Sequence, residues 1–203
     1  QPDPRPTRDA SDEALPPYVG PTRLSETGLY SDFASRTLAP GLIRWVPAYP
    51  LWSDGSEKER YLLLPQGQKI DTSDMDNWMF PVGTKSWKEF RVGGKLIETR
   101  FLWKQGTGGV NDWVLVSFVW EPDGSDAIAR PEGVFNASGT THDVPNMQDC
   151  YNCHQHISDV VVGFSALSLS YPATIPAAPP GDAGSDASDD AGAIEAGAPD
   201  AGS

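Results

Sequence analysis

The sequence predicts a mainly β domain organised as an antiparallel sheet or sandwich. Residues 84–92 and Lys95–Lys104 have strand character and flank Gly93-Gly94, a pair that accepts the positive φ of a tight hairpin turn. Trp113–Trp120 is apolar at nearly every position, as expected for a central strand that is buried on both faces. The chain also has seven tryptophans, which indicates an aromatic core.

The remaining segments add shorter elements to this sheet. Residues 24–38 are predicted to form two short helices or turns, and residues 42–52, which contain two prolines, to run extended across the core surface. Residues 58–64 are a further predicted strand. The acidic residues 71–77 lack the glycine and the distal glutamate of a calcium loop, so a solvated turn is predicted there. Residues 157–169 have the apolar spacing of a helix.

Composition divides the chain into three parts. Residues 1–22 are rich in proline and polar residues, and residues 172–203 contain almost only Pro, Ala, Gly, Asp and Ser, so both are predicted to be disordered. The domain is expected to occupy residues 23–171. A Pro-rich leader on an exported domain suggests a lipid tether upstream of Gln1.

Charge and hydropathy limit the partners. The net charge of −13 argues against nucleic acid, whose phosphates would repel the protein. No run approaches the roughly 20 apolar residues of a membrane span, so no transmembrane segment is expected. The chain begins with Gln1 and shows no apolar signal region, and we expect that any export signal has already been removed.

The only two cysteines lie in Cys150-Tyr-Asn-Cys153-His154, which has the C-x-x-C-H spacing of a c-type haem attachment site. One helical turn between the thiols lets each form a thioether with one vinyl group of the haem. His154, on the same turn, is then held beneath the iron as the proximal ligand. The sequence therefore predicts one covalent haem c on a helix that follows the strands. Because this attachment takes place outside the bacterial cytoplasm, a periplasmic or cell-surface location is expected.

Two other readings of the cysteines stay open. A thiol–disulfide site is expected to open a helix in a βαβ context, whereas the segment before Cys150 is polar and contains Pro145. A zinc site of Cys150, Cys153, His156 and His142 has the right number of ligands, but it gives His154 no role.

The ligand on the opposite face of the iron is not evident, because no methionine follows Cys153. The candidates are Met79 and His142, with Met75, Met147 and His156 less favoured. Met147 and His156 are too close to the motif in sequence, and Met79 lies between aromatic residues that suggest core packing. An open distal face is the alternative.

Several separated motifs resemble a family of exported bacterial c-type cytochromes, many of them dihaem and of undefined role. The matching segments are LSETGLY (24–30), PLWSDGSEKERY (50–61), LPQG (64–67), FPVGTKSWKEF (80–90), and the stretch from Val144-Pro through the haem motif to VGFSALSL (162–169). The resemblance covers about residues 24–170. This chain has one haem motif, so we expect it to lack the second haem domain of the dihaem members.

A weaker resemblance is to the cytochrome P460 and c′-β group. That group also places C-x-x-C-H near the end of a β-rich fold that contains a strand beginning Pro-x-Gly-Thr, here residues 81–84. In the P460 enzymes a lysine is cross-linked to the haem. The resemblance leaves Lys85, Lys88 and Lys104 as the positions to consider.

Two classes of function follow from these expectations. A sixth iron ligand would make the protein an electron carrier, which is the function that requires the fewest residues. An open distal site among aromatic residues would instead suit gas binding or a haem-dependent oxidoreductase, although no acid–base pair is identifiable in the sequence. A third alternative is a haem-bearing module of a larger cell-surface assembly.

Overall fold

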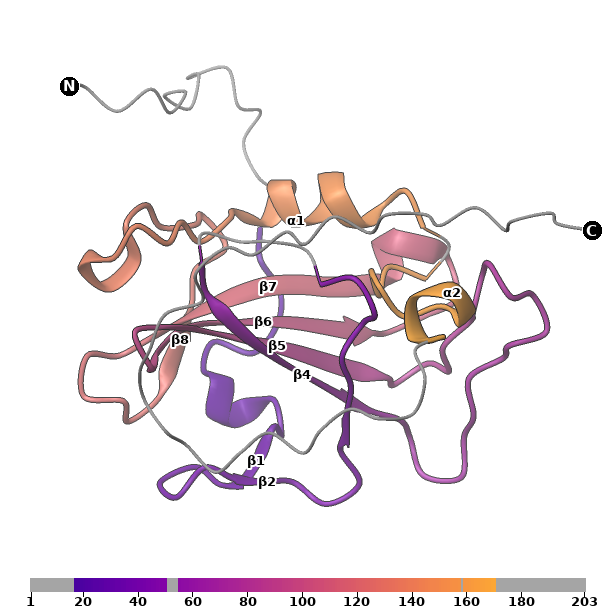
Figure 1. The fold of residues 1–203 in the computed structure, drawn as a ribbon, viewed down its shortest axis with the longest axis horizontal. Helices are drawn as coiled ribbons and strands as arrows, with labels where there is room; N and C mark the ends of the chain where they lie inside the picture. The colour runs from indigo at the N-terminus through magenta and orange to yellow at the C-terminus, as the bar shows by residue number, and fades with distance from the viewer. Residues whose placement is uncertain (1–16, 51–54, 158, 171–203) are drawn as a thin grey trace, which may run out of the picture. The chain divides into compact units, whose positions relative to one another are not determined.

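The computed structural model describes residues 17–50, 55–157 and 159–170. They form a mainly β structure with two antiparallel sheets, as the sequence predicts. Six strands make the larger sheet in the sequential order β3(Ile43–Arg44), β4(Glu57–Leu63), β5(Lys85–Val92), β6(Lys95–Lys104), β7(Trp113–Trp120) and β8(Ala127–Ala129). Each of these strands pairs only with neighbours in the chain, so the sheet is a simple meander (Figure 1).

The central strands lie close to their predicted positions. β5 and β6 are joined by Gly93 and Gly94, whose φ values of 56° and 76° match the predicted hairpin turn. β7 pairs with β6 over seven residues and is almost entirely buried, which confirms the prediction of a central strand. The predicted strand 58–64 corresponds to β4.

The first predicted helical segment, residues 24–38, was wrong in part. Only Leu24–Glu26 is helical, as the 3-10 turn η1. It is followed by a second, two-stranded sheet of β1(Tyr30–Asp32) and β2(Thr37–Leu38). Gly28, at φ 86°, prevents the helical turn from continuing, and the positive φ of Arg36 reverses the chain between the two strands.

The two faces of the large sheet are covered by different parts of the chain. On one face the η1 and β1–β2 region packs against a core formed by Tyr61, Trp87, Leu96, Phe101, Val116, Phe118 and Trp120. On the other face, helix α1(Met147–His154) and the loop after it cover Leu62, Leu102, Trp113 and Leu115. Figure 1 shows α1 on one side of the sheet and β1–β2 on the other.

The segment after α1 also differs from its prediction. Of residues 157–169 only the last turn, α2(Ala166–Leu169), is helical. Val160 and Gly163 have φ values of 48° and 83°, which a continuous helix does not allow. The remaining described elements are the short 3-10 turns η2(Gly109–Asp112) and η3(Ala137–Gly139). No helix in the described ranges has both the length and the apolar character needed to cross a bilayer.

Candidate cofactor site

The helix that carries the cysteine motif begins with a capping box. The Asn146 side chain accepts a hydrogen bond from the Asp149 N–H at 2.7 Å, and the Asp149 carboxylate accepts one from the Asn146 N–H at 3.2 Å. These two bonds satisfy donors that a helix start otherwise leaves without partners. The Tyr151 hydroxyl donates to the Trp113 carbonyl at 2.8 Å, which fixes the helix against β7. α1 is therefore held in one position over the sheet.

The two cysteines point to different environments, and neither is in a disulfide. Cys150 is 9% exposed and packs in the apolar cluster that includes Leu102 and Leu115. Burial raises the pKa of the Cys150 thiol to about 11, so it is fully protonated at neutral pH. Cys153 is exposed and, together with His154, lines a cavity between α1 and the sheet.

The His154 ring is oriented by the chain that follows the helix. Its Nδ1 hydrogen-bonds the Val160 carbonyl, and because a carbonyl oxygen only accepts, Nδ1 carries the proton. Nε2 is then the nitrogen with a free lone pair. Burial lowers the pKa of His154, and the nearby cations Arg100 and Lys88 lower it further. The neutral tautomer with an available Nε2 is the form of imidazole that binds iron.

The Val160 carbonyl is in turn held by a buried clamp around Asp159. Lys104 donates to Asp159 at 2.7 Å and to the Phe80 carbonyl at 2.8 Å, and both charged side chains are at most 4% exposed. The Trp113 indole N–H donates to the other carboxylate oxygen at 2.9 Å, and the Phe80 N–H also donates to Asp159. Strands β6 and β7 thus fix the position of the loop that orients His154.

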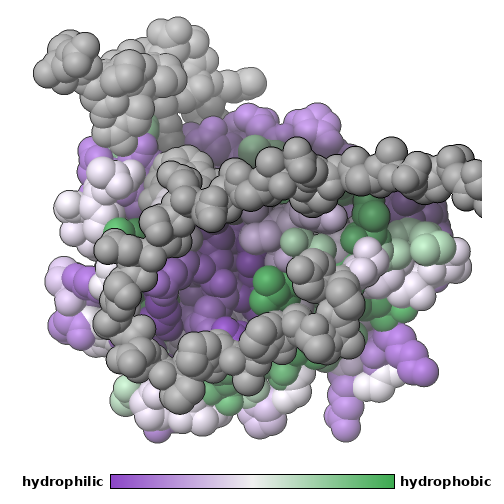
Figure 2. Space-filling model, in the orientation of Figure 1, coloured by the Kyte–Doolittle hydropathy of each residue, from purple (hydrophilic) through white to green (hydrophobic). Residues whose placement is uncertain are grey.

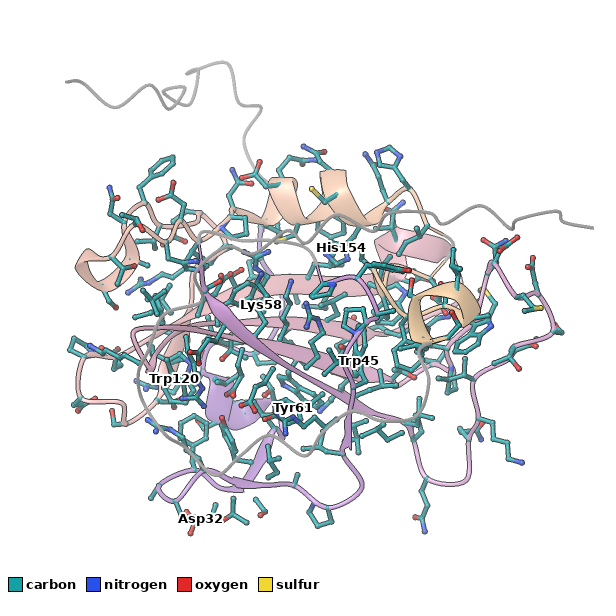
Figure 3. The ribbon with its side chains drawn as sticks, in the orientation of Figure 1. Asp32, Trp45, Lys58, Tyr61, Trp120 and His154 are labelled. Carbon is teal, nitrogen blue, oxygen red and sulfur yellow. The ribbon has the colours of Figure 1, made fainter. Side chains whose placement is uncertain are left out.

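The cavity beneath His154 has a volume of about 510 Å³. Its lining combines aromatic and apolar side chains with three cations from neighbouring strands, and consists of Trp45, Pro47, Tyr49, Arg60, Ser86, Trp87, Lys88, Arg100, Leu102, Cys153, His154, Val161, Val162, Gly163 and Ser168. The volume lies in the usual range of roughly 300–1,000 Å³ for cofactor and small-molecule sites. Figure 3 labels Trp45, Lys58 and His154 near the middle of the view, and Figure 2 shows hydrophilic and hydrophobic residues meeting there.

Arg100, which lines the cavity, belongs to a buried polar network. Glu98 is 0% exposed and accepts two hydrogen bonds from Arg100, at 2.7 and 3.1 Å. The Nε2 of His142 lies 2.7 Å from the same carboxylate. Burial alone would raise the pKa of Glu98, but Arg100 and the hydrogen bond with His142 outweigh it and hold that pKa below its usual range.

The distal ligand candidates are not brought to the cavity lining. His142 is 1% exposed and bonded to Glu98, and Met79 is 40% exposed and pairs through its backbone with Asp71. Met75 and His156 are exposed, and Met147, at the start of α1, is buried on another side of the helix beside Tyr18. All six methionines and histidines of the chain lie in the described ranges, and His154 alone lines the cavity.

Of the three lysines suggested by the P460 resemblance, one reaches the cavity. Lys88 lines it, whereas Lys85 donates to the Thr27 carbonyl and Lys104 belongs to the Asp159 clamp. Burial lowers the pKa of Lys88 to about 7, and repulsion by Arg100, Arg60 and Lys58 adds to the effect.

The zinc alternative finds no support in the geometry. Within the described ranges, no group of three or more His, Cys, Asp or Glu side chains is placed to hold a metal ion. Cys150 is packed in the apolar cluster and Cys153 is exposed, while the His142 ring is hydrogen-bonded to Glu98.

Comparisons with protein-family profiles, with curated proteins and with solved structures found no match to this chain.

These residues fit a haem. The two thiols and the imidazole lie within about one turn of a single helix. Cys153 and His154 line the aromatic and cationic cavity, Nε2 of His154 is free, and the Cys150 thiol packs in the neighbouring apolar cluster. Arg60, Arg100 and Asp159 were missed by sequence reasoning. The available signal for the two arginines was their alternation on the predicted strands, which places them on one face.

Proposed function

We propose that this protein is an exported c-type cytochrome that carries one haem, joined to Cys150 and Cys153 and ligated by His154. The observation that supports this best is the position of Cys153 and His154 on the lining of the 510 Å³ cavity, with Nδ1 of His154 bonded to the Val160 carbonyl. When bound, the haem supplies iron that exchanges one electron between its ferric and ferrous forms.

The chain's own residues would hold and insulate that group. α1 is fixed by its capping box and by the Tyr151 hydrogen bond, so the two cysteine side chains that would form the thioethers are held in place. The Asp159 clamp keeps the imidazole in one tautomer and orientation, which favours a constant reduction potential. The aromatic ring of Trp45 excludes water from part of the cavity. Electron transfer is the simplest function of such a site.

The second candidate is a gas-binding protein or a haem-dependent oxidoreductase with an open distal face. It is favoured by the lining of the cavity, which includes no methionine and no histidine other than His154. In this reading Lys88 would be the lysine that corresponds to the P460 resemblance. The first reading would require a sixth ligand of another kind or a rearrangement that brings one in.

Mass spectrometry of the full chain, expressed in a host that attaches haem c outside the cytoplasm, tests the proposal. We expect an added mass of one haem that resists extraction with acidified acetone. Replacing one thiol, as in Cys153→Ser, is expected to leave at most one thioether and to lower haem retention. An unmodified mass for the parent chain under conditions that mature a control cytochrome would overturn the proposal.

Optical and EPR spectra with and without CO separate the two candidates. A low-spin spectrum that CO does not change supports an electron carrier. A shift of the Soret band on adding CO to the reduced protein supports the open-site reading.

A further inference from the structure

Three cations form a row across the sheet beneath His154. In the register of the strands, Arg60 of β4 is opposite Lys88 of β5, and Lys88 is opposite Arg100 of β6. Directly opposed residues have Cβ atoms about 4.5–5.5 Å apart, and like charges at that distance destabilise a sheet. All three side chains line the 510 Å³ cavity.

The protein neutralises this row only in part. Glu98 forms a bidentate ion pair with Arg100, so that one of the three charges is compensated. Arg60 is 5% exposed, and its side chain has neither a hydrogen bond nor an ion pair with any described residue, although its backbone carbonyl accepts a hydrogen bond from Trp45. Its guanidinium instead lies over the Trp45 ring, 5.6 Å from the ring centre, and the Lys88 amine lies 4.8 Å from the centre of Phe90.

The other groups that face the row do not supply a negative charge. Lys58 precedes Arg60 on the same face of β4, and His154 approaches from α1. Trp45, which also lines the cavity, has a buried indole N–H with no acceptor among the described residues. Arg60 and Lys88 thus line the cavity without an ion pair to any described residue, beside the ring of Trp45.

A buried, unpaired guanidinium is costly unless something in the site accepts its hydrogen bonds. Arginine donors match the planar oxygens of carboxylates and related oxyanions. We propose that Arg60, Lys88 and Arg100 form an oxyanion subsite inside the cavity, and that its ligand is a carboxylate or a comparable small oxyanion.

The oxyanion can come from two sources. One is the haem itself, which carries two propionates and would bring two negative charges; this source rests on the proposed function. The other is a free anion that enters the cavity beside the iron or in its absence. With either source, Arg60 and Lys88 bind the oxyanion. The two sources differ in whether an anion added to the solution binds in the cavity.

The experiment compares Arg60→Gln and Lys88→Gln with Lys95→Gln in the haem-loaded full chain. Lys95 is exposed at the start of β6 and away from the cavity, so its variant changes the net charge equally. The first measurement is the reduction potential as a function of pH. The second is a titration with sodium formate, followed by the Soret band against sodium chloride of equal ionic strength.

If propionates occupy the row, formate has no effect on the parent protein. The pH-dependent step of the potential then moves to higher pH in Arg60→Gln and Lys88→Gln, because a propionate without its cation binds protons more tightly. If a free oxyanion is the ligand, formate shifts the Soret band saturably. Its affinity then falls about tenfold or more in the two cavity variants, as expected for the loss of a charged hydrogen bond. Cavity variants that match Lys95→Gln in both measurements overturn the subsite.

A failure of the haem proposal is seen separately, because the intact mass then shows no haem. In that case the thermal midpoint of the same chain is measured with and without formate. A larger rise in the parent and in Lys95→Gln than in Arg60→Gln supports a free-oxyanion site. An equal rise in all three overturns it.

Discussion

The clamp around Asp159 predicts a large loss of stability when Lys104 is replaced by methionine. Lys104 and Asp159 are 4% and 2% exposed, and their charged atoms are 2.7 Å apart. Removing one partner of a buried ion pair typically costs about 3–5 kcal/mol, because the other charge stays buried. Asp159 would retain hydrogen bonds from Trp113 and from the Phe80 backbone, so we expect a value near the lower end, about 3 kcal/mol.

Urea unfolding followed by tryptophan fluorescence measures this change, with the exposed Lys95→Met as the matched control. Asp159→Asn keeps the size of the side chain and removes its charge. The double variant Lys104→Met with Asp159→Asn should then lose less than the sum of the two single changes, by at least about 1 kcal/mol. A loss below about 1 kcal/mol in Lys104→Met, equal to that of the control, would show that the clamp does not hold the loop.

Two further predictions concern the cavity and the start of α1. In the haem-free Cys150→Ser/Cys153→Ser chain, the depressed pKa of Lys88, about 7, means that only the unfolded chain keeps the extra proton between pH 7 and about 10.5. The unfolding free energy should therefore rise with pH in this window, by at most about 1.4 kcal/mol per pH unit. Urea unfolding at several pH values measures this rise, and Lys88→Met should flatten it. An unchanged dependence on pH in Lys88→Met would contradict the buried, cationic environment assigned to Lys88. Gly133→Ala should destabilise the protein by about 1–3 kcal/mol in thermal unfolding, because Gly133 has a φ of 71° and a Cβ would lie 2.7 Å from backbone atoms of Val144 and Asn146. A neutral effect there would mean that the loop before the helix adjusts freely.

Local patterns were sufficient to predict the centre of the sheet. The alternation in Lys95–Lys104 and the glycine pair before it determine a hairpin without help from distant residues, and β5, β6 and β7 match. The segment 24–38 was harder, since its β1–β2 pairing depends on Arg36 adopting a left-handed conformation. Nothing in the local sequence requires that.

The candidate site likewise has a part that local sequence predicts and a part that depends on distant residues. The cysteine motif and its helix could be read from spacing, because a helical turn brings those residues together by itself. The Asp159 clamp could not, since it joins residues 55 and 46 positions apart in the chain. The neighbouring contact explains why residues 157–169 are not a continuous helix: Val160 turns, at φ 48°, and its carbonyl accepts a hydrogen bond from Nδ1 of His154.

The burial of Cys150 imposes an order on the maturation of the proposed cytochrome. All six strands of the large sheet precede α1 in the chain, so the sheet can form before the helix has docked. Once α1 is docked, Cys150 is 9% exposed and packed against Leu102 and Leu115, where an attachment enzyme cannot reach its sulfur. If haem is attached as proposed, the thioether at Cys150 would have to form while the helix is undocked, and docking of α1 would then close a site that already contains the haem.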